Sequence, residues 1–223
     1  MTDSATAAAT ALVERARDQI AAKPTGNRFL DLLEEGKVPR ERLRRFAGEQ
    51  YRIINSDRRS FALLAARFPE SPAGDLFLSL AQGEGQALRL LPAFAAALGW
   101  SAADLREYEP QPLAQAYPAY LAWQALNGTS SAVVLAMLVN LDEWGRYCGR
   151  TAATLSTGYG LRQDATSFFR FFAGPPPEFG GQAAAVIAAG LAAGEDPADA
   201  LRAARMLHAY ETAFWESLAD GLD

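Results

Sequence analysis

The chain has 223 residues, of which 50% are hydrophobic, and a formal net charge of −5. This length allows one or two domains, and because no Pro-, Gly- or Ser-rich linker divides the chain we expect a single domain over residues 1–223. The acidic charge and the lack of a long basic run exclude nucleic acid and anionic membranes as favoured partners.

The cysteine content and the apolar runs limit the class of protein further. Cys148 is the sole cysteine, so the chain forms no internal disulfide and no cysteine-based zinc cluster. The first residues lack the basic region of a secretory signal, and no stretch approaches the roughly 18 uninterrupted apolar residues of a membrane span. We therefore expect a cytoplasmic protein.

Helical spacing of apolar residues extends along nearly the whole chain, and the alternating pattern of β-strands is nearly absent. Glycines follow several of the expected helix ends, and Asp196-Pro197 is typical of a helix start. In chain order we expect helices over 2–22, 28–35, 39–68, 73–98, a short one capped by Ser101, then 113–126, 130–156, 164–172, 182–193 and 197–218. The sequence predicts an all-α protein, a compact bundle of about seven to nine helices.

Polar side chains interrupt the core-facing stripes of the four long helices. Burying such a group costs ~1–3 kcal/mol unless it is paired, so each needs a partner, a ligand or a water-filled cavity. These residues are Gln50, Asp57, Glu84, Asn140 and Glu211, with Glu143 at the border of its stripe. Because ligand sites in bundles form between facing helices, we expect them to converge in one pocket. The alternative is that each is a core polar group satisfied by a neighbouring arginine or tyrosine.

Three phrases of the sequence resemble one known group of proteins. They are Phe46-Ala-Gly-Glu-Gln-Tyr51, Ala95-Ala-Ala-Leu-Gly99 and Tyr210-Glu-Thr-Ala-Phe-Trp215. Together they are similar to the heme-oxygenase-like helical superfamily, over roughly residues 28–222. That superfamily includes the thiaminase II (TenA-like) enzymes, the pyrroloquinoline-quinone synthase C-like oxidases and the heme-oxygenase-like di-iron oxidases. The resemblance implies a heme-oxygenase-like helical fold.

The resemblance to the di-iron branch extends to only two of its six metal-ligand positions. Glu84 and Glu143 match the two glutamates of that branch. The other positions hold Leu91, Phe172, Pro176 and Phe179, which carry no donor for iron. The sole histidine, His208, lies near the last turns of the final helix, so the proximal histidine of the heme-degrading branch is also missing. We expect no metal ligands and no cofactor.

The thiaminase II branch resembles the last helix, where its catalytic glutamate matches Glu211. Its nucleophilic cysteine and its aspartate fall near Asn140 and Gln50 here. Because an amide serves neither as a nucleophile nor as a general base at neutral pH, we do not expect thiamin hydrolysis. Cys148 lies two turns beyond the position of the nucleophile.

These observations favour a metal-independent enzyme that acts on a small, largely apolar molecule, in specialised (natural product) biosynthesis. Glu211, Glu84 and Glu143 would act as general acid or base in a cyclisation, isomerisation, elimination or cofactor-free oxygenation, since burial raises the pKa of a carboxyl group. The expected substrate-binding residues are Gln50, Tyr51, Asp57, Asn140, Trp144, Tyr147, Phe172 and Tyr210. The alternative is a non-catalytic small-molecule-binding or accessory protein that keeps the fold without the chemistry.

We also expect a homodimer, for two reasons. Members of the superfamily commonly associate. The alanine-rich first helix and the helix over 182–193 offer faces of small residues suited to close packing.

Overall fold

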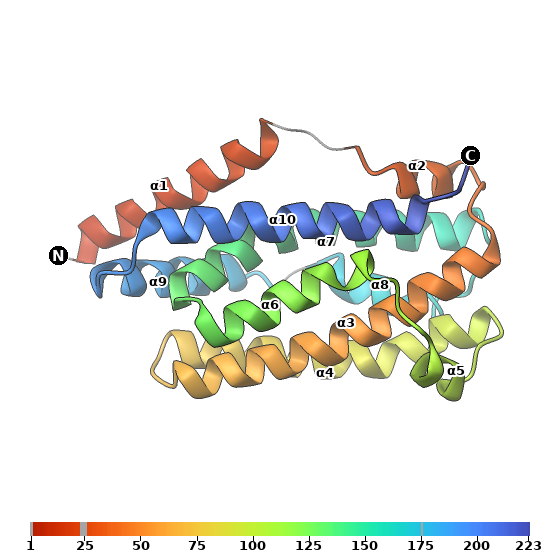
Figure 1. The fold of residues 1–223 in the computed structure, drawn as a ribbon, viewed down its shortest axis with the longest axis horizontal. Helices are drawn as coiled ribbons and strands as arrows, with labels where there is room; N and C mark the ends of the chain where they lie inside the picture. The colour runs from red at the N-terminus through yellow and green to blue at the C-terminus, as the bar shows by residue number, and fades with distance from the viewer. Residues whose placement is uncertain (1, 23–25, 175) are drawn as a thin grey trace.

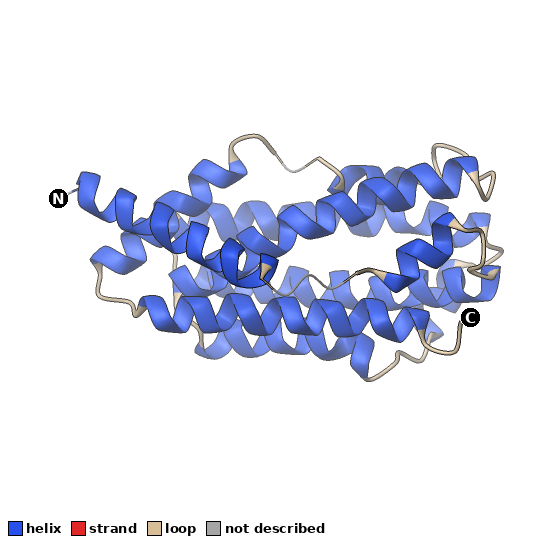
Figure 2. Ribbon diagram, turned by 90° about the horizontal axis from the view of Figure 1, so that it is seen from above, coloured by secondary structure: helices blue, strands red, loops and turns tan. Residues whose placement is uncertain are grey.

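The computed structural model describes residues 2–22, 26–174 and 176–223. Within these ranges the fold consists of ten α-helices and one short 3-10 helix, with no strand (Figure 2). In chain order they are α1 Thr2–Ala21, α2 Arg28–Glu34, α3 Arg40–Arg67, α4 Ala73–Ala97, α5 Ala102–Glu107, η1 Leu113–Gln115, α6 Ala116–Asn127, α7 Ser130–Thr157, α8 Ser167–Phe172, α9 Phe179–Ala192 and α10 Pro197–Ala219. The all-α prediction is confirmed.

Local capping explains why several helices start where the sequence predicts. The Ser101 hydroxyl accepts a hydrogen bond from the Asp104 backbone N–H, and the Asp104 carboxylate accepts one from the Ser101 N–H, which makes a capping box at α5. Asp196 caps α10 through the Ala198 N–H, with Pro197 in the first turn. Gly99, with φ of 84°, ends the turn after α4 in a conformation that favours glycine.

Two of the predicted helices begin at other residues. The helix expected over 164–172 is the shorter α8, because the Asp164 carboxylate binds Arg162 at 2.6 Å and the Ala165 N–H at 3.0 Å and holds a turn there. Conversely, α9 starts at Phe179 and not at residue 182. Burial of the Phe179 ring, which is 8% exposed, outweighs the poor helix propensity of the two glycines that follow it.

The segment expected as one helix over 113–126 is divided. It begins as the 3-10 helix η1 and continues as α6. Pro118 lacks the backbone N–H that would bond to Ala114, so the regular α-helical ladder cannot extend back through this point. The exposed face of this segment carries the large apolar side chains of Leu113, Trp123 and Leu126.

The long helices form two packed pairs. Helices α3 and α4 lie along the lower half of Figure 1, and α7 and α10 lie along the upper half, with α6 crossing between α3 and α10. Helix α8 packs on α4 and α7, so it covers the interior from another side. Side chains from facing helices of both pairs therefore meet in the middle of the bundle.

The small-residue faces of the first and ninth helices contact each other within one chain. Helix α1 packs on α9 and on α10. Ala9 and Ala16 on α1, and Ala183 on α9, are buried there. One side of each helix is therefore occupied internally, while Ala8 and Ala11 on α1 and Ala185 on α9 remain exposed.

The core has two clusters of buried apolar side chains. One is rich in aromatic rings and includes Phe46, Phe94 and Trp215. The other is mainly aliphatic and extends from α1 and α9 to the first half of α7. No helix in the described ranges combines the length and the apolar character needed to cross a membrane.

Candidate functional site

A cavity of about 50 Å³ lies inside the bundle, where α3, α4, α6, α7, α8 and α10 face one another. A volume of this order holds a few water molecules. Its lining is mostly apolar, with a few polar groups. The lining residues are Gln50, Ile53, Ile54, Asp57, Glu84, Tyr117, Met137, Asn140, Leu141, Trp144, Phe172, Glu211 and Phe214. The polar residues that interrupt four separate helical stripes are thus brought to one place.

Helical periodicity explains how α3 supplies four of these side chains. Gln50, Ile53, Ile54 and Asp57 stand at positions i, i+3, i+4 and i+7 of one helix, so they share one face. That face turns inward, because Ile54 is 1% exposed and Asp57 is 4% exposed. The two polar residues are therefore held inside by the apolar residues between them.

Asp57 and Glu84 form a pair of carboxyl groups in the cavity, contributed by the neighbouring helices α3 and α4. Burial raises the pKa of Glu84 to about 8. Burial, followed by the negative charge of Glu84, raises the pKa of Asp57 well above its usual value, while the nearby Tyr117 hydroxyl acts to lower it. Two carboxyl groups close together in apolar surroundings favour the protonated form, because their negative charges repel each other.

Glu211 enters the same cavity from α10 and is 5% exposed. One oxygen, Oε1, accepts a hydrogen bond of 3.3 Å from the Trp215 indole N–H. Burial, followed by the charge of Glu143, raises the pKa of Glu211 to about 8. At neutral pH the Glu211 carboxyl is accordingly protonated and able to donate a proton.

Three buried polar atoms of the cavity residues have no hydrogen-bond partner among the described residues. They are Asp57 Oδ1, Asn140 Nδ2 and Glu211 Oε2. A buried donor or acceptor without a partner costs ~1–3 kcal/mol. Native proteins keep few such groups, and each calls for an explanation. Three of them on one cavity indicate a surface made to bind something.

Glu143 faces a different space from the one expected. Its Oε2 lies 3.1 Å from Nδ1 of His208, and its Oε1 accepts a 2.8 Å hydrogen bond from the Tyr147 hydroxyl. Burial acts to raise the pKa of Glu143, but the hydrogen bonds from His208 and Tyr147 outweigh it and lower that pKa. Glu143 is therefore an ionised, paired carboxylate, which corrects its placement in the same pocket as Glu84.

Glu143 and Tyr147 line a second cavity of about 360 Å³, beside the last turns of α10. Glu211 lines both this space and the internal cavity. The Glu211 carboxyl thus stands between the interior of the bundle and a cavity that reaches Arg28 and Asp220 near its end.

The remaining predicted binding residues divide into two groups. Trp144 and Phe172 line the internal cavity, with their rings in edge contact at 5.8 Å. Tyr51 lies instead in an outer groove between α3 and α6, and the Tyr210 ring packs on Tyr120 at 5.2 Å. Tyr51 and Tyr210 were expected to line the same pocket, but their positions on α3 and α10 turn them away from the cavity.

The sequence profile of the TENA/THI-4/PQQC family matches residues 18–170. This chain belongs to the TENA/THI-4/PQQC family. No curated protein sequence gives a significant match. The predicted resemblance to the TenA-like branch and to the wider heme-oxygenase-like group is confirmed.

Solved structures of similar fold include other TenA homologues. A TenA homologue from P. horikoshii OT3 has a TM-score of 0.69 at 16% identity, and the match covers 96% of this chain and 97% of that one. A domain of unknown function with a heme oxygenase-like fold from Shewanella denitrificans OS217 has a TM-score of 0.69 at 15% identity, with 92% and 88% covered. A TenA family transcription regulator from Silicibacter sp. TM1040 has a TM-score of 0.68 at 14% identity, and the match covers 97% of this chain and 96% of that one. At these identities the likeness shows the fold.

The donor set of this family member does not fit a di-iron centre. Glu84 lies on the internal cavity, whereas Glu143 lies on the second one. Leu91 is fully buried in the aromatic core. Among residues 2–22, 26–174 and 176–223, no three His, Cys, Asp or Glu side chains are placed to hold a metal ion.

Tyr117 is the main cavity residue that the sequence prediction missed. It lies on α6, and Leu121 and Gln124, at i+4 and i+7, are buried on the same face. That spacing carries the signal, since it is the periodicity used on the long helices. Burial and the carboxyl groups of Asp57, Glu211 and Glu84 raise the pKa of Tyr117, so its hydroxyl stays a hydrogen-bond donor.

Proposed function

We propose that this TENA/THI-4/PQQC family member is a metal-independent enzyme that converts a small, largely apolar molecule in its internal cavity. Glu211 supplies the proton. The observation that carries this proposal is the buried Glu211 carboxyl, which has one oxygen fixed by Trp215 and the other, Oε2, buried without a partner, in a residue that lines the cavity. A buried acid with one oxygen fixed and the other unpaired is suited to act as a general acid.

The other polar groups are suited to orient a substrate. Asn140 offers an N–H donor without a partner, and Tyr117 offers a hydroxyl. Trp144, Phe172 and Phe214 supply apolar walls that exclude water. Protonation of a bound, electron-rich molecule in such a site leads to cyclisation, isomerisation or elimination, which are reactions of specialised biosynthesis. Cofactor-free oxygenation needs the substrate to be held in the same way.

Thiamin hydrolysis is less well supported by the residues present. The position of the thiaminase II nucleophile falls near Asn140, which cannot attack as a nucleophile. Cys148 is fully buried in the aromatic core, and burial raises the pKa of its thiol, which disfavours the thiolate. Gln50, near the place of the aspartate, is an amide that cannot accept a proton at neutral pH.

A non-catalytic binding or accessory protein is the second candidate. The structural neighbour from Silicibacter sp. TM1040 is called a transcription regulator, and a ligand sensor also needs unpartnered groups on a cavity. The two candidates differ in what Glu211 does. A sensor needs only its contacts, whereas an enzyme needs its proton.

The test begins with untargeted mass spectrometry of small molecules that co-purify with the native protein. The identified compound and its close analogues are then incubated with wild type and with the Glu211→Gln variant. We expect product formation with wild type and a loss of about 10²–10⁴-fold with Glu211→Gln, the range for lost acid–base catalysis. Tight binding without turnover in both proteins would favour the second candidate.

We further propose that the protein is a cytoplasmic homodimer. Leu113, Trp123 and Leu126, exposed by 64%, 54% and 64%, form an apolar face along η1 and α6 that a second copy could cover. One chain has a mass of 24.0 kDa, and light scattering at micromolar concentration should give twice that mass. A mass of a single chain would contradict the proposal.

A further inference from the structure

We infer that the internal cavity takes the protonated amine of a small apolar molecule, with the ammonium group seated between the carboxyl groups of Asp57 and Glu84. This inference rests on the proposed function, because it assigns a substrate class to the same cavity. It concerns the acids that α3 and α4 contribute to the cavity, whereas Glu211 comes from α10, and it is tested by binding alone.

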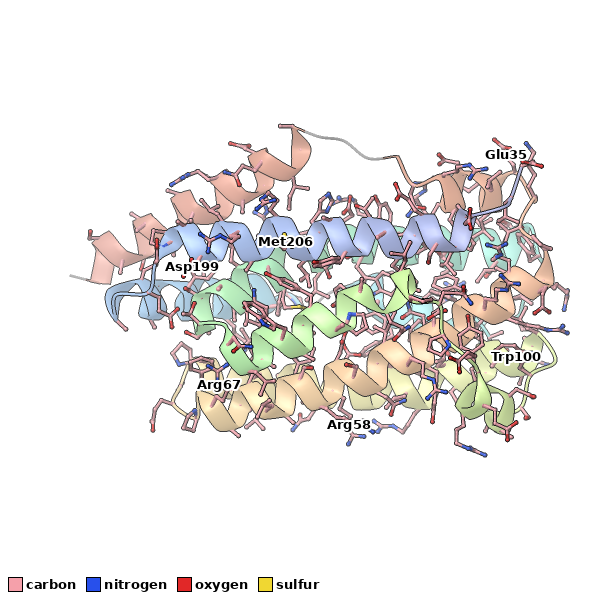
Figure 3. The ribbon with its side chains drawn as sticks, in the orientation of Figure 1. Glu35, Arg58, Arg67, Trp100, Asp199 and Met206 are labelled. Atoms are coloured by element: carbon pink, nitrogen blue, oxygen red, sulfur yellow. The ribbon has the colours of Figure 1, made fainter. Side chains whose placement is uncertain are left out.

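The charge of the lining sets the sign of the ligand. Asp57, Glu84 and Glu211 line the cavity, and none of the thirteen lining residues is Arg, Lys or His. Arg58, next to Asp57 in the sequence, is exposed and projects from the outer edge of the bundle (Figure 3). An anionic ligand would find no positively charged partner among these residues and would be desolvated beside three acids, whereas a cation gains a carboxylate.

The unpartnered atoms specify the type of cation. Asp57 is 4% exposed, and its Oδ1 has no hydrogen-bond partner. An ammonium group has three N–H donors on one small centre, enough to reach Asp57 Oδ1 and Glu84 together. Asn140 Nδ2 is a donor without a partner, so the ligand should also carry an acceptor such as a hydroxyl or carbonyl oxygen. The aromatic walls then bury the apolar part.

Binding of an ammonium ion releases a proton. Tyr117 from α6, Asn140 from α7 and Glu211 from α10 surround the pair, and none is a base that could take up the proton. Before binding, burial keeps Glu84 protonated below its pKa of about 8. The ammonium replaces that proton, which leaves to water as the carboxylate forms. Below pH 8 the affinity should therefore rise about tenfold for each unit of pH.

The experiment is titration calorimetry with three probes small enough for a cavity of about 50 Å³: ethylamine, ethanol and acetate. We expect ethylamine to bind at least about tenfold more tightly than ethanol at pH 8. We expect acetate to bind no more tightly than ethanol. Repeating the ethylamine titration at pH 7 in buffers of different ionisation enthalpy should show release of about one proton per molecule bound.

Two variants complete the test. Asp57→Asn combined with Glu84→Gln keeps the shape of the cavity and should abolish the preference for ethylamine over ethanol, with no proton released. Glu14→Gln, at an exposed position on α1, is the matched control and should behave as wild type. Equal binding of amine and alcohol by wild type, binding without proton release, or no binding of ethylamine would each overturn the inference.

These outcomes are separable from failure of the proposed function. If the co-purifying compound is neutral and its conversion depends on Glu211, the proposed function stands and the amine inference fails. If ethylamine binds with release of a proton but Glu211→Gln leaves turnover unchanged, the amine inference stands and the proposed function fails.

Discussion

Two buried carboxyl groups on α3, Glu49 and Asp57, have opposite environments. Glu49 is 0% exposed and accepts hydrogen bonds of 2.7 Å from the Tyr108 hydroxyl, 2.7 Å from the Gln111 N–H and 2.5 Å from the Gln115 amide. Asp57 is 4% exposed, and one of its oxygens has no partner. Burial is nearly equal, so burial does not distinguish a structural acid from a candidate site residue.

What differs is the set of neighbouring groups. The segment between α5 and α6 directs three donors at Glu49, and the charge of Glu49 fixes that segment to α3. Asp57 is surrounded by the acid Glu84, the hydroxyl of Tyr117 and apolar side chains. A carboxylate with three donors stabilises the fold, whereas a buried carboxyl group with one oxygen unpaired and another acid beside it favours the protonated form.

The largest effect is expected from Glu49→Gln. Replacing the carboxylate by an amide loses the charge and turns one acceptor into a donor that faces other donors. The free energy of unfolding should fall by about 3 kcal/mol, since hydrogen bonds to a charged group contribute ~1.5–3 kcal/mol each. Urea denaturation measures the change, with Glu14→Gln as the control. If the free energy of unfolding of Glu49→Gln equals that of the control within experimental error, the contacts of Glu49 do not stabilise the fold.

An effect of intermediate size is expected on the way the free energy of unfolding depends on pH. Because the pKa of Glu211 in the folded chain is raised to about 8, the folded state binds more protons than the unfolded state between about pH 4.5 and 8, so stability falls as pH rises through that window. Glu211→Gln removes this contribution. From pH 5.5 to pH 7 the variant should lose on the order of 2 kcal/mol less than wild type. Parallel pH profiles would mean that Glu211 is ionised in the folded protein.

The smallest effect is expected from Asp57→Asn. The amide has nearly the same shape and removes the repulsion between Asp57 and Glu84, so the free energy of unfolding at pH 7 should stay the same or rise by about 1 kcal/mol. Thermal unfolding measured beside Glu49→Gln gives the contrast directly. A clear loss of stability would place Asp57 with Glu49, as a structural acid.

The position of the candidate site was partly readable in the sequence. Gln50, Asp57, Glu84, Asn140 and Glu211 all interrupt apolar stripes, and all five line the internal cavity. Periodicity alone specifies which side of a helix faces the core. It does not specify which other segments cover a helix, and for this reason it missed Glu49, which is buried under the segment between α5 and α6.

The sequence by itself determined the all-helical class, most helix ends and the inward face of each long helix, because these depend on spacing and capping within a few residues. The tertiary structure decided the rest. In the folded chain Tyr51 and Tyr210 point away from the cavity, Glu143 pairs with His208, and Tyr117 on α6 lines the cavity. Those outcomes depend on how helices far apart in the chain pack, and the pattern of one helix carries no information about the rotation of its neighbour.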